Sequence, residues 1–145
     1  MNPSLEIALA TLPHGAEFRF VSRLLSLQPG ISAEGEYQPT AELDYFRGHF
    51  PGEPIVPGVL LVEAVAQLGG IAAQADPSIS PLRNLRLAGI RNAKITGAAR
   101  PGQTIRLEAT VMGRMGGLIL VGGSASMDGT LILRCEVSLS GQEGA

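Results

Sequence analysis

Two residues in the middle of the chain could work as a base and an acid. His49 is of the type that most often serves as a general base near neutral pH. Glu63 is the one ionisable residue between Pro54 and Ala75, and a carboxylic acid in apolar surroundings can keep its proton for use as a general acid. The alternatives are a histidine that only caps a loop and a structural carboxylate paired with an arginine.

The backbone around His49 is rich in proline and glycine, which limits its freedom. The residues concerned are Gly48, Pro51, Gly52, Pro54, Pro57 and Gly58, and Phe50 follows the histidine directly. A rigid histidine near a buried carboxylate is a plausible acid–base arrangement.

A helix is predicted to begin beside this segment. Pro57 suits a first helical position, where its missing N–H costs nothing, and Gly58 allows another group to approach the backbone. The free N–H groups of a first turn, which includes Val59, can hold a polarised carbonyl oxygen. Gln67, four residues after Glu63, is expected within hydrogen-bonding reach of it.

The predicted helix runs from about Pro57 to Gln74 and would be about 27 Å long. Its apolar character raises the question of a membrane span. Prolines, glycines, glutamines and Glu63 within the run, and the lack of a basic flank, favour the centre of a globular domain instead.

Strands are predicted on both sides of this helix. Alternation and turn signals place them at residues 17–27, 31–37, 85–95, 104–112, 118–127 and 130–140, with a tight hairpin at Asp128-Gly129. In the last strand one apolar face is expected, made by Leu131, Leu133, Cys135, Val137 and Leu139. A short helix is predicted over residues 2–10, with Asn2 as its N-cap.

Strands with one apolar face need a cover, and the central helix is the one long apolar element available. We therefore predict an α+β fold of the hot-dog type, in which an antiparallel sheet wraps around one helix. The 145 residues suit a single domain, 1–145.

Composition excludes several classes. A net charge of −2 gives no case for nucleic-acid binding, and a single cysteine, Cys135, excludes an internal disulfide or a cysteine-based metal cluster. No signal peptide is predicted, because the first residues carry no basic leader. His14 is interpreted as a turn or surface histidine and Cys135 as a core residue. No metal or other cofactor is expected. The expected location is cytoplasmic.

Charge is unevenly distributed along the chain. Six of the eleven basic residues, and no acidic residue, fall between Pro77 and Leu107. A solvated face is the ordinary interpretation of such a segment. The alternative is a docking surface for an acidic partner, with Arg86, Arg91, Lys94 and Arg100 as candidate contacts.

The stretch from His49 to Gln67, HFPGEPIVPGVLLVEAVAQ, resembles the signature H-F-P-G-x-P-x-x-P-G-V-L-x-x-E-A-x-A-Q of the FabZ-type 3-hydroxyacyl-ACP dehydratases at every fixed position. The likeness extends to LPHGAEFRFVSRLL and LAGIRNAKITGAARPGQ, and so covers roughly residues 5 to 140. It implies a hot-dog homodimer, often a trimer of dimers, whose active sites lie between protomers.

The resemblance also implies residue roles. His49 would remove the C2 proton of a (3R)-3-hydroxyacyl thioester, Glu63 of the other protomer would protonate the departing hydroxyl, and the N–H of Gly58 would hold the thioester carbonyl. Phe50, Pro57, Val59 and Gln67 would line the substrate site. The substrate would arrive on acyl carrier protein, whose acidic surface fits the basic segment.

Some positions depart from the family. Gly15, Glu17, Arg19 and Ser22 stand where Arg, Pro, Leu and Asp are usual, and Leu85 and Arg86 replace common aromatic residues. These changes leave the chain length of the substrate open and suggest a specialised paralogue. Isomerase activity is not expected, since isomerising relatives tend to have Asp in place of Glu63. Two alternatives remain: a hot-dog thioesterase, and a non-catalytic acyl- or carrier-binding module.

Overall fold

The computed structural model describes residues 3–144, so the predicted N-cap Asn2 lies outside the described residues. Three helices are arranged around one sheet: α1 (Pro3–Ala10), α2 (Tyr45–Gly48) and α3 (Gly58–Gln74), with a short 3-10 turn, η1 (Ala16–Phe18). The strands are β1 (Arg23–Gln28), β2 (Ser32–Tyr37), β3 (Arg83–Ile95), β4 (Ile105–Met115), β5 (Leu118–Met127) and β6 (Thr130–Gln142).

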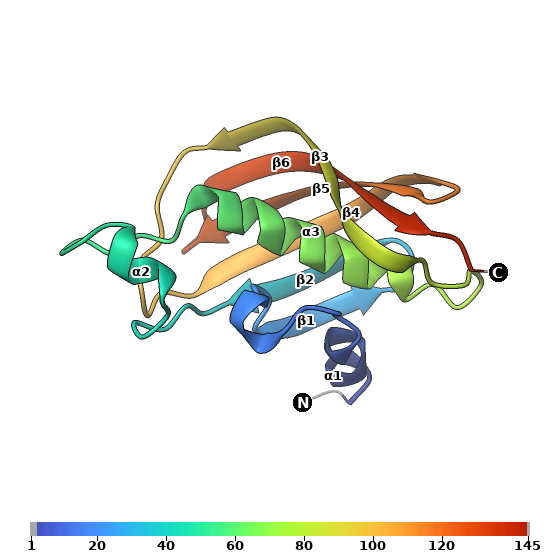
Figure 1. Ribbon diagram of the computed structural model, residues 1–145, viewed down its shortest axis with the longest axis horizontal. Helices are drawn as coiled ribbons and strands as arrows, with labels where there is room; N and C mark the ends of the chain where they lie inside the picture. Colours follow the sequence, from blue (N-terminus) through green and yellow to red (C-terminus); the bar gives the residue numbers. More distant parts are fainter. Residues whose placement is uncertain (1–2, 145) are drawn as a thin grey trace.

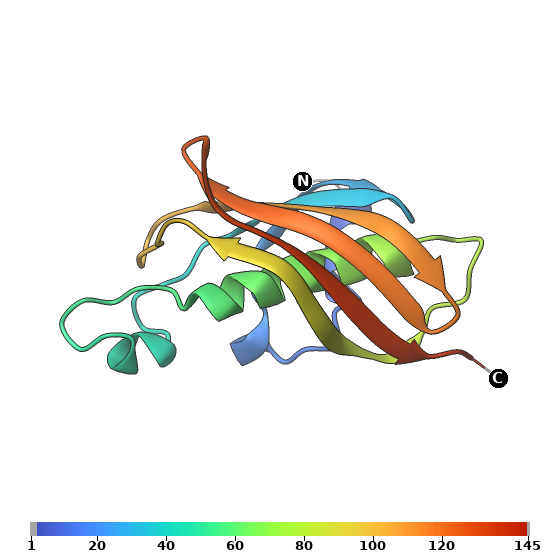
Figure 2. The same ribbon diagram turned by 90° about the horizontal axis from the view of Figure 1, so that it is seen from above.

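All six strands form a single antiparallel sheet in the order β1-β2-β4-β5-β6-β3. Figure 1 shows α3 lying across one face of this sheet, and Figure 2 shows the long strands bending over the helix. β3 is an edge strand, at the opposite side of the sheet from β1. The predicted α+β hot-dog architecture is confirmed.

The core lies between α3 and the sheet. Leu61, Val65, Leu68 and Ile71 of the helix are buried, as are the inward-facing residues Ile105, Leu107, Ile119, Val121 and Leu133 of the strands. The hydrophobic effect thus explains why the helix is apolar nearly all round: the sheet covers one side of it, and neighbouring segments cover much of the rest.

Two glycines let the helix approach the sheet closely. A Cβ on Gly69 of α3 would collide with Val121, and a Cβ on Gly123 of β5 would collide with Val65 and with the backbone of β4 at Glu108. The small residues at these positions therefore set the spacing between the two layers.

Two local predictions are wrong. The stretch around Phe18 and Phe20 does not form a strand: η1 ends at Phe18, and β1 begins only at Arg23. Leu131 is 46% exposed, whereas its neighbour Ile132 is buried. The pairing of β5 with β6 shifts between Ala125 and Ser126, and this β-bulge turns Leu131 away from the face that Leu133 shares.

The predicted hairpin is present. Asp128 and Gly129 both have positive φ, 50° and 80°, as a two-residue turn between antiparallel strands requires. Within residues 3–144, no helix combines the length and the apolar character that crossing a membrane would need.

Candidate active site

His49 directly follows α2, on the segment that leads into α3. Its Nδ1 lies 2.8 Å from the carbonyl oxygen of Ile55, and the backbone N–H of Ile55 donates in turn to the carbonyl of His49, also at 2.8 Å. A carbonyl can only accept, so Nδ1 carries the proton and Nε2 keeps its lone pair. The ring stacks on Phe50, with centroids 4.0 Å apart. This arrangement suits a general base.

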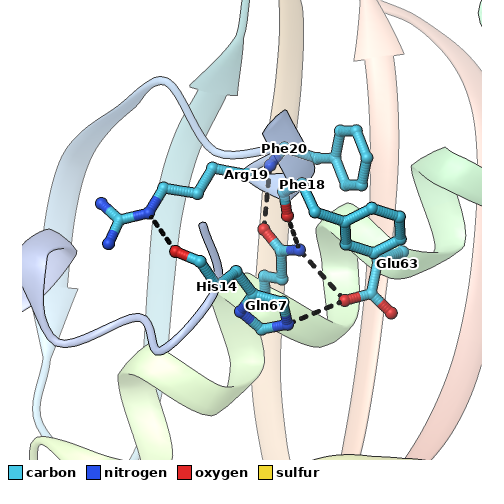
Figure 3. Close-up of polar contacts among 6 residues, drawn as sticks. All are labelled: His14, Phe18, Arg19, Phe20, Glu63 and Gln67. Atoms are coloured by element: carbon cyan, nitrogen blue, oxygen red, sulfur yellow. Dashed lines mark hydrogen bonds and ion pairs between the residues drawn. The ribbon is translucent and has the colours of Figure 1, made fainter. Parts of the chain in front are cut away.

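Glu63 lies on the second turn of α3, with 17% of its side chain exposed. Its Oε2 accepts a hydrogen bond of 3.0 Å from Nε2 of Gln67, one helical turn on, as the spacing predicts. Gln67 itself is only 2% exposed. Figure 3 shows that the second carboxylate oxygen of Glu63 points away from this contact.

Sequence analysis missed the role of His14, because the contact it makes crosses a long stretch of chain. Its Nε2 lies 3.4 Å from Oε2 of Glu63 (Figure 3). His14 lies on the loop between α1 and η1. Because of its contact with Glu63, it is part of the candidate site and not simply a surface histidine. The motif LPH, noted as part of the resemblance, was the available signal.

The start of α3 is open to solvent. Gly58 is its first residue, after Pro57, and a Cβ there would come within 2.6 Å of Ile95 on β3. Val59 is 69% exposed and Phe50 is 51% exposed. Exposed apolar side chains therefore lie next to the predicted N–H site, at Val59, and in the loop that leads to it, at Phe50.

A cavity of about 300 Å³ extends from Glu63 along the C-terminal half of α3. His14, Glu63 and Gln67 lie in its wall, and much of the remaining wall is apolar, including Ile71, Leu82, Leu85, Leu87 and Leu139. An apolar cavity with a few polar groups on one side is typical of a site for a small organic group.

No described contact joins His49 to Glu63 within the chain. His49 is not among the residues that line the Glu63 cavity. Its described hydrogen bonds and ring contact are with Ile55 and Phe50. A single chain therefore presents the two residues of the predicted acid–base pair separately.

The four basic candidates are all exposed, but their surroundings differ. Arg86 lines the Glu63 cavity, whereas Arg91 and Lys94 line two other pockets on the sheet, of about 220 and 640 Å³ respectively. Arg100 pairs with Glu53 at 3.2 Å, close to the loop that follows His49.

Comparison with known proteins places this geometry in a family. The model of the FabA-like domain matches residues 12–136. The chain belongs to the FabA-like family. Among curated members, the protein named 3-hydroxyacyl-[acyl-carrier-protein] dehydratase FabZ of Chloroflexus aggregans is 44% identical over 105 residues, 72% of each chain. The FabZ of Roseiflexus sp. is 38% identical over 136 residues, 94% of this chain and 93% of the relative.

Solved structures of a dehydratase complex and of a thioesterase superfamily member agree with this chain in fold. The dehydratase heterocomplex ApeI:P from Xenorhabdus doucetiae superposes with a TM-score of 0.76 at 14% identity, covering 91% of this chain and 88% of its own. Zebra fish thioesterase superfamily member 2 gives 0.69 at 19% identity, covering 94% of each. At such identities the likeness is one of fold, shared by dehydratases and thioesterases alike.

Proposed function

We propose that this chain dehydrates (3R)-3-hydroxyacyl-ACP to trans-2-enoyl-ACP in the biosynthesis of fatty acids or related acyl chains. The observation that carries the proposal is kinship: relatives named as FabZ dehydratases match over more than nine-tenths of the chain. The acid–base residues that such a reaction needs, His49 and Glu63, are both present and restrained.

The proposed reaction assigns one proton transfer to each of the two residues. Nε2 of His49 takes the C2 proton, and the electrons of that C–H bond form the C2–C3 double bond as the C3–O bond breaks. Glu63 donates its proton to the departing hydroxyl, so that water leaves and the thioester stays intact. The reaction transfers no electrons to an outside acceptor, so it requires no redox cofactor.

The start of α3 supplies a hydrogen-bond donor for the thioester carbonyl. The N–H of Gly58 points along the axis of a helix N-terminus, where a carbonyl oxygen gaining enolate charge would be stabilised. Pro57 and Val59 flank Gly58 in the chain, and Phe50, which stacks on His49, would line the site as well. Gln67 holds Glu63 through its hydrogen bond to Oε2. In this proposal the acyl chain occupies the apolar cavity next to Glu63.

The active unit in this proposal is a homodimer, in which His49 of one protomer meets Glu63 of its partner. Support comes from the separation of the two residues in one protomer and from the edge strand β3, whose outer side is free to pair. The exposed apolar side chains of Phe50, Val59 and Ile95 would be covered by a second copy. Three such dimers could assemble further.

Acyl carrier protein would deliver the substrate, and the exposed basic residues would dock it. Charge reversal at Arg91 or Lys94 should weaken carrier binding and its dependence on salt, because both effects come from exposed charges. Turnover of a short thioester without the carrier should not change. Unchanged carrier binding at all salt concentrations would remove these residues from the docking surface.

We further infer a cytoplasmic location, which the single, buried Cys135 permits because no disulfide is required.

Turnover of matched thioesters tests the proposed function. The purified chain is incubated with 3-hydroxyacyl-ACP and, separately, with enoyl-ACP across chain lengths. We expect interconversion of the two with the thioester intact, and a loss of about 100- to 10,000-fold in His49→Ala. Release of free carrier thiol would indicate a thioesterase instead. No turnover, with the biological activity retained in His49→Ala and Glu63→Gln, would indicate a binding module.

A further inference from the structure

Oε2 of Glu63 lies close to two nitrogen atoms from different parts of the chain. Gln67 on the same helix donates to it at 3.0 Å, and Nε2 of His14 lies 3.4 Å from it. Figure 3 shows both contacts on the same oxygen, with the other oxygen free of either. The two oxygens of this carboxyl group are therefore not equivalent.

The orientation of the Gln67 amide is fixed. Its Oε1 accepts the backbone N–H of Phe20 at 2.9 Å, and its Nε2 donates to the carbonyl of Phe18, also at 2.9 Å. A flipped amide would place two donors together and two acceptors together, so the NH₂ group must face Glu63. One donor on Oε2 is thus permanent.

The orientation of His14 follows from its surroundings. Its Nδ1 is buried and has no hydrogen-bond partner among the described residues. Leaving a buried N–H without an acceptor costs more free energy than leaving a buried lone pair without a donor. The ring proton is therefore placed on Nε2, where an acceptor is close by. That tautomer presents Nε2–H to Oε2 of Glu63. The ring also lies nearly parallel to Phe18, at 20°.

Arg19 holds the loop that carries His14. Its guanidinium donates to the carbonyl of His14 at 2.8 Å and to that of Leu12 at 3.0 Å. Arg19 stands where the FabZ-type pattern has Leu, and Gly15 stands where it has Arg. This chain therefore fixes the loop with an arginine of its own.

We propose that His14 is a positioning residue for Glu63, a statement that rests on the proposed dehydratase function. Gln67 donates to Oε2, and His14, whose Nε2 lies 3.4 Å from the same oxygen, would donate to it in the substrate complex. The two donors would keep the transferable proton on Oε1, the oxygen that faces away from both (Figure 3). When Oε1 gives its proton to the departing hydroxyl, the carboxylate that remains is stabilised by two N–H donors. His14 itself neither gains nor loses a proton. The contact of 3.4 Å would shorten in the substrate complex.

Two substitutions separate this role from a structural one. His14→Phe keeps a ring against Phe18 but removes the donor, and His14→Gln places an amide N–H near the position of Nε2. We expect His14→Phe to lower kcat about tenfold or more with KM nearly unchanged, and His14→Gln to recover most of that loss. Equal kcat values in wild type and His14→Phe would overturn the proposal. Thermal unfolding of both variants checks that the fold is intact.

A readout without turnover keeps the inference separate from the proposed function. The chain has two histidines, so in His49→Ala the nitrogen-15 ring signals belong to His14 alone. We expect the Nε2–H tautomer of His14. Its Nε2–H proton signal should shift in Glu63→Ala. The same signal should stay in place in the control Glu17→Gln, which removes a carboxylate from the adjoining turn η1. The Nδ1–H tautomer, or no response to Glu63→Ala, would contradict the proposal even if the chain is a dehydratase. Absence of turnover in wild type with the expected signals would instead refute the dehydratase function alone.

Discussion

At the scale of single residues, backbone and side chains restrain the two reactive groups in different ways. The carbonyl of Ile55 sets the tautomer of His49, whereas two side chains contact Glu63: Gln67 from the same helix and His14 from the N-terminal loop. The sequence could point to His49, Glu63 and the helical partner Gln67, because their spacing is local. It could not point to His14, since that contact depends on how the N-terminal loop folds onto α3.

Gln67 should matter for stability as well as for orientation. Gln67→Leu would leave the N–H of Phe20 and the carbonyl of Phe18 without their partner. We expect a loss of about 1–3 kcal/mol in the free energy of unfolding, measured by denaturant titration. Gln38→Leu is the control, because Gln38 is exposed and its change should stay within about 0.5 kcal/mol. A smaller loss in Gln67→Leu than in this control would count against the buried amide's role.

Cys135 should make the protein less stable at alkaline pH. Burial raises the pKa of this thiol from 9.0 to about 11. Above pH 9 the unfolded chain releases the proton and the folded chain keeps it, so the free energy of unfolding falls as pH rises towards 11, by about 1.4 kcal/mol per pH unit from this group.

The measurement is unfolding in denaturant between pH 7 and pH 11, in wild type and Cys135→Ala. The absolute stabilities will differ because the substitution also removes a buried sulfur. The informative quantity is the slope of the unfolding free energy against pH. Above pH 9 we expect this slope to be shallower in Cys135→Ala than in wild type. Parallel slopes would mean that the folded thiol ionises as readily as the unfolded one.

At the scale of elements, the fold depends on how closely α3 approaches the sheet. The alternation of apolar residues predicted most strands well, because burial on one face imposes that period, and the long apolar run after Pro57 predicted the helix. It failed at residues 17–22 and at Leu131, where a 3-10 turn and a β-bulge break the period. Neither feature leaves a local signal that alternation can detect.

Two neighbouring glycines of α3 test the close packing. Gly69→Ala should cost about 1–3 kcal/mol in the free energy of unfolding, because its Cβ would overlap Val121. Gly70→Ala is the matched control: its Cβ would meet Leu85 at 3.5 Å, an ordinary contact, and alanine favours the helix by about 1 kcal/mol. We expect the first variant to be destabilised and the second to be unchanged or stabilised, as judged by thermal and denaturant unfolding. Similar unfolding free energies for the two variants would show that α3 and the sheet can move apart without loss of stability.

At the scale of the whole molecule, the proposed function requires two copies of the chain to complete each site. The sheet presents β3 at its edge, and apolar residues at the start of α3 are uncovered. The sequence suggested this arrangement only through its family resemblance, because no pattern within one chain records what a second copy covers. Among the described residues, His49 does not line the Glu63 cavity of its own chain, and the shared-site proposal accounts for how the two residues would still act together.

Mixing two inactive variants is the most direct test of this central claim. His49→Ala and Glu63→Gln chains are unfolded together, refolded as a 1:1 mixture and assayed with 3-hydroxyacyl-ACP. Half of the dimers should be mixed, and each mixed dimer should hold one intact site, so the account predicts about a quarter of wild-type turnover. A mixture that is no more active than its two components, although mixed dimers are present by mass spectrometry, would contradict it.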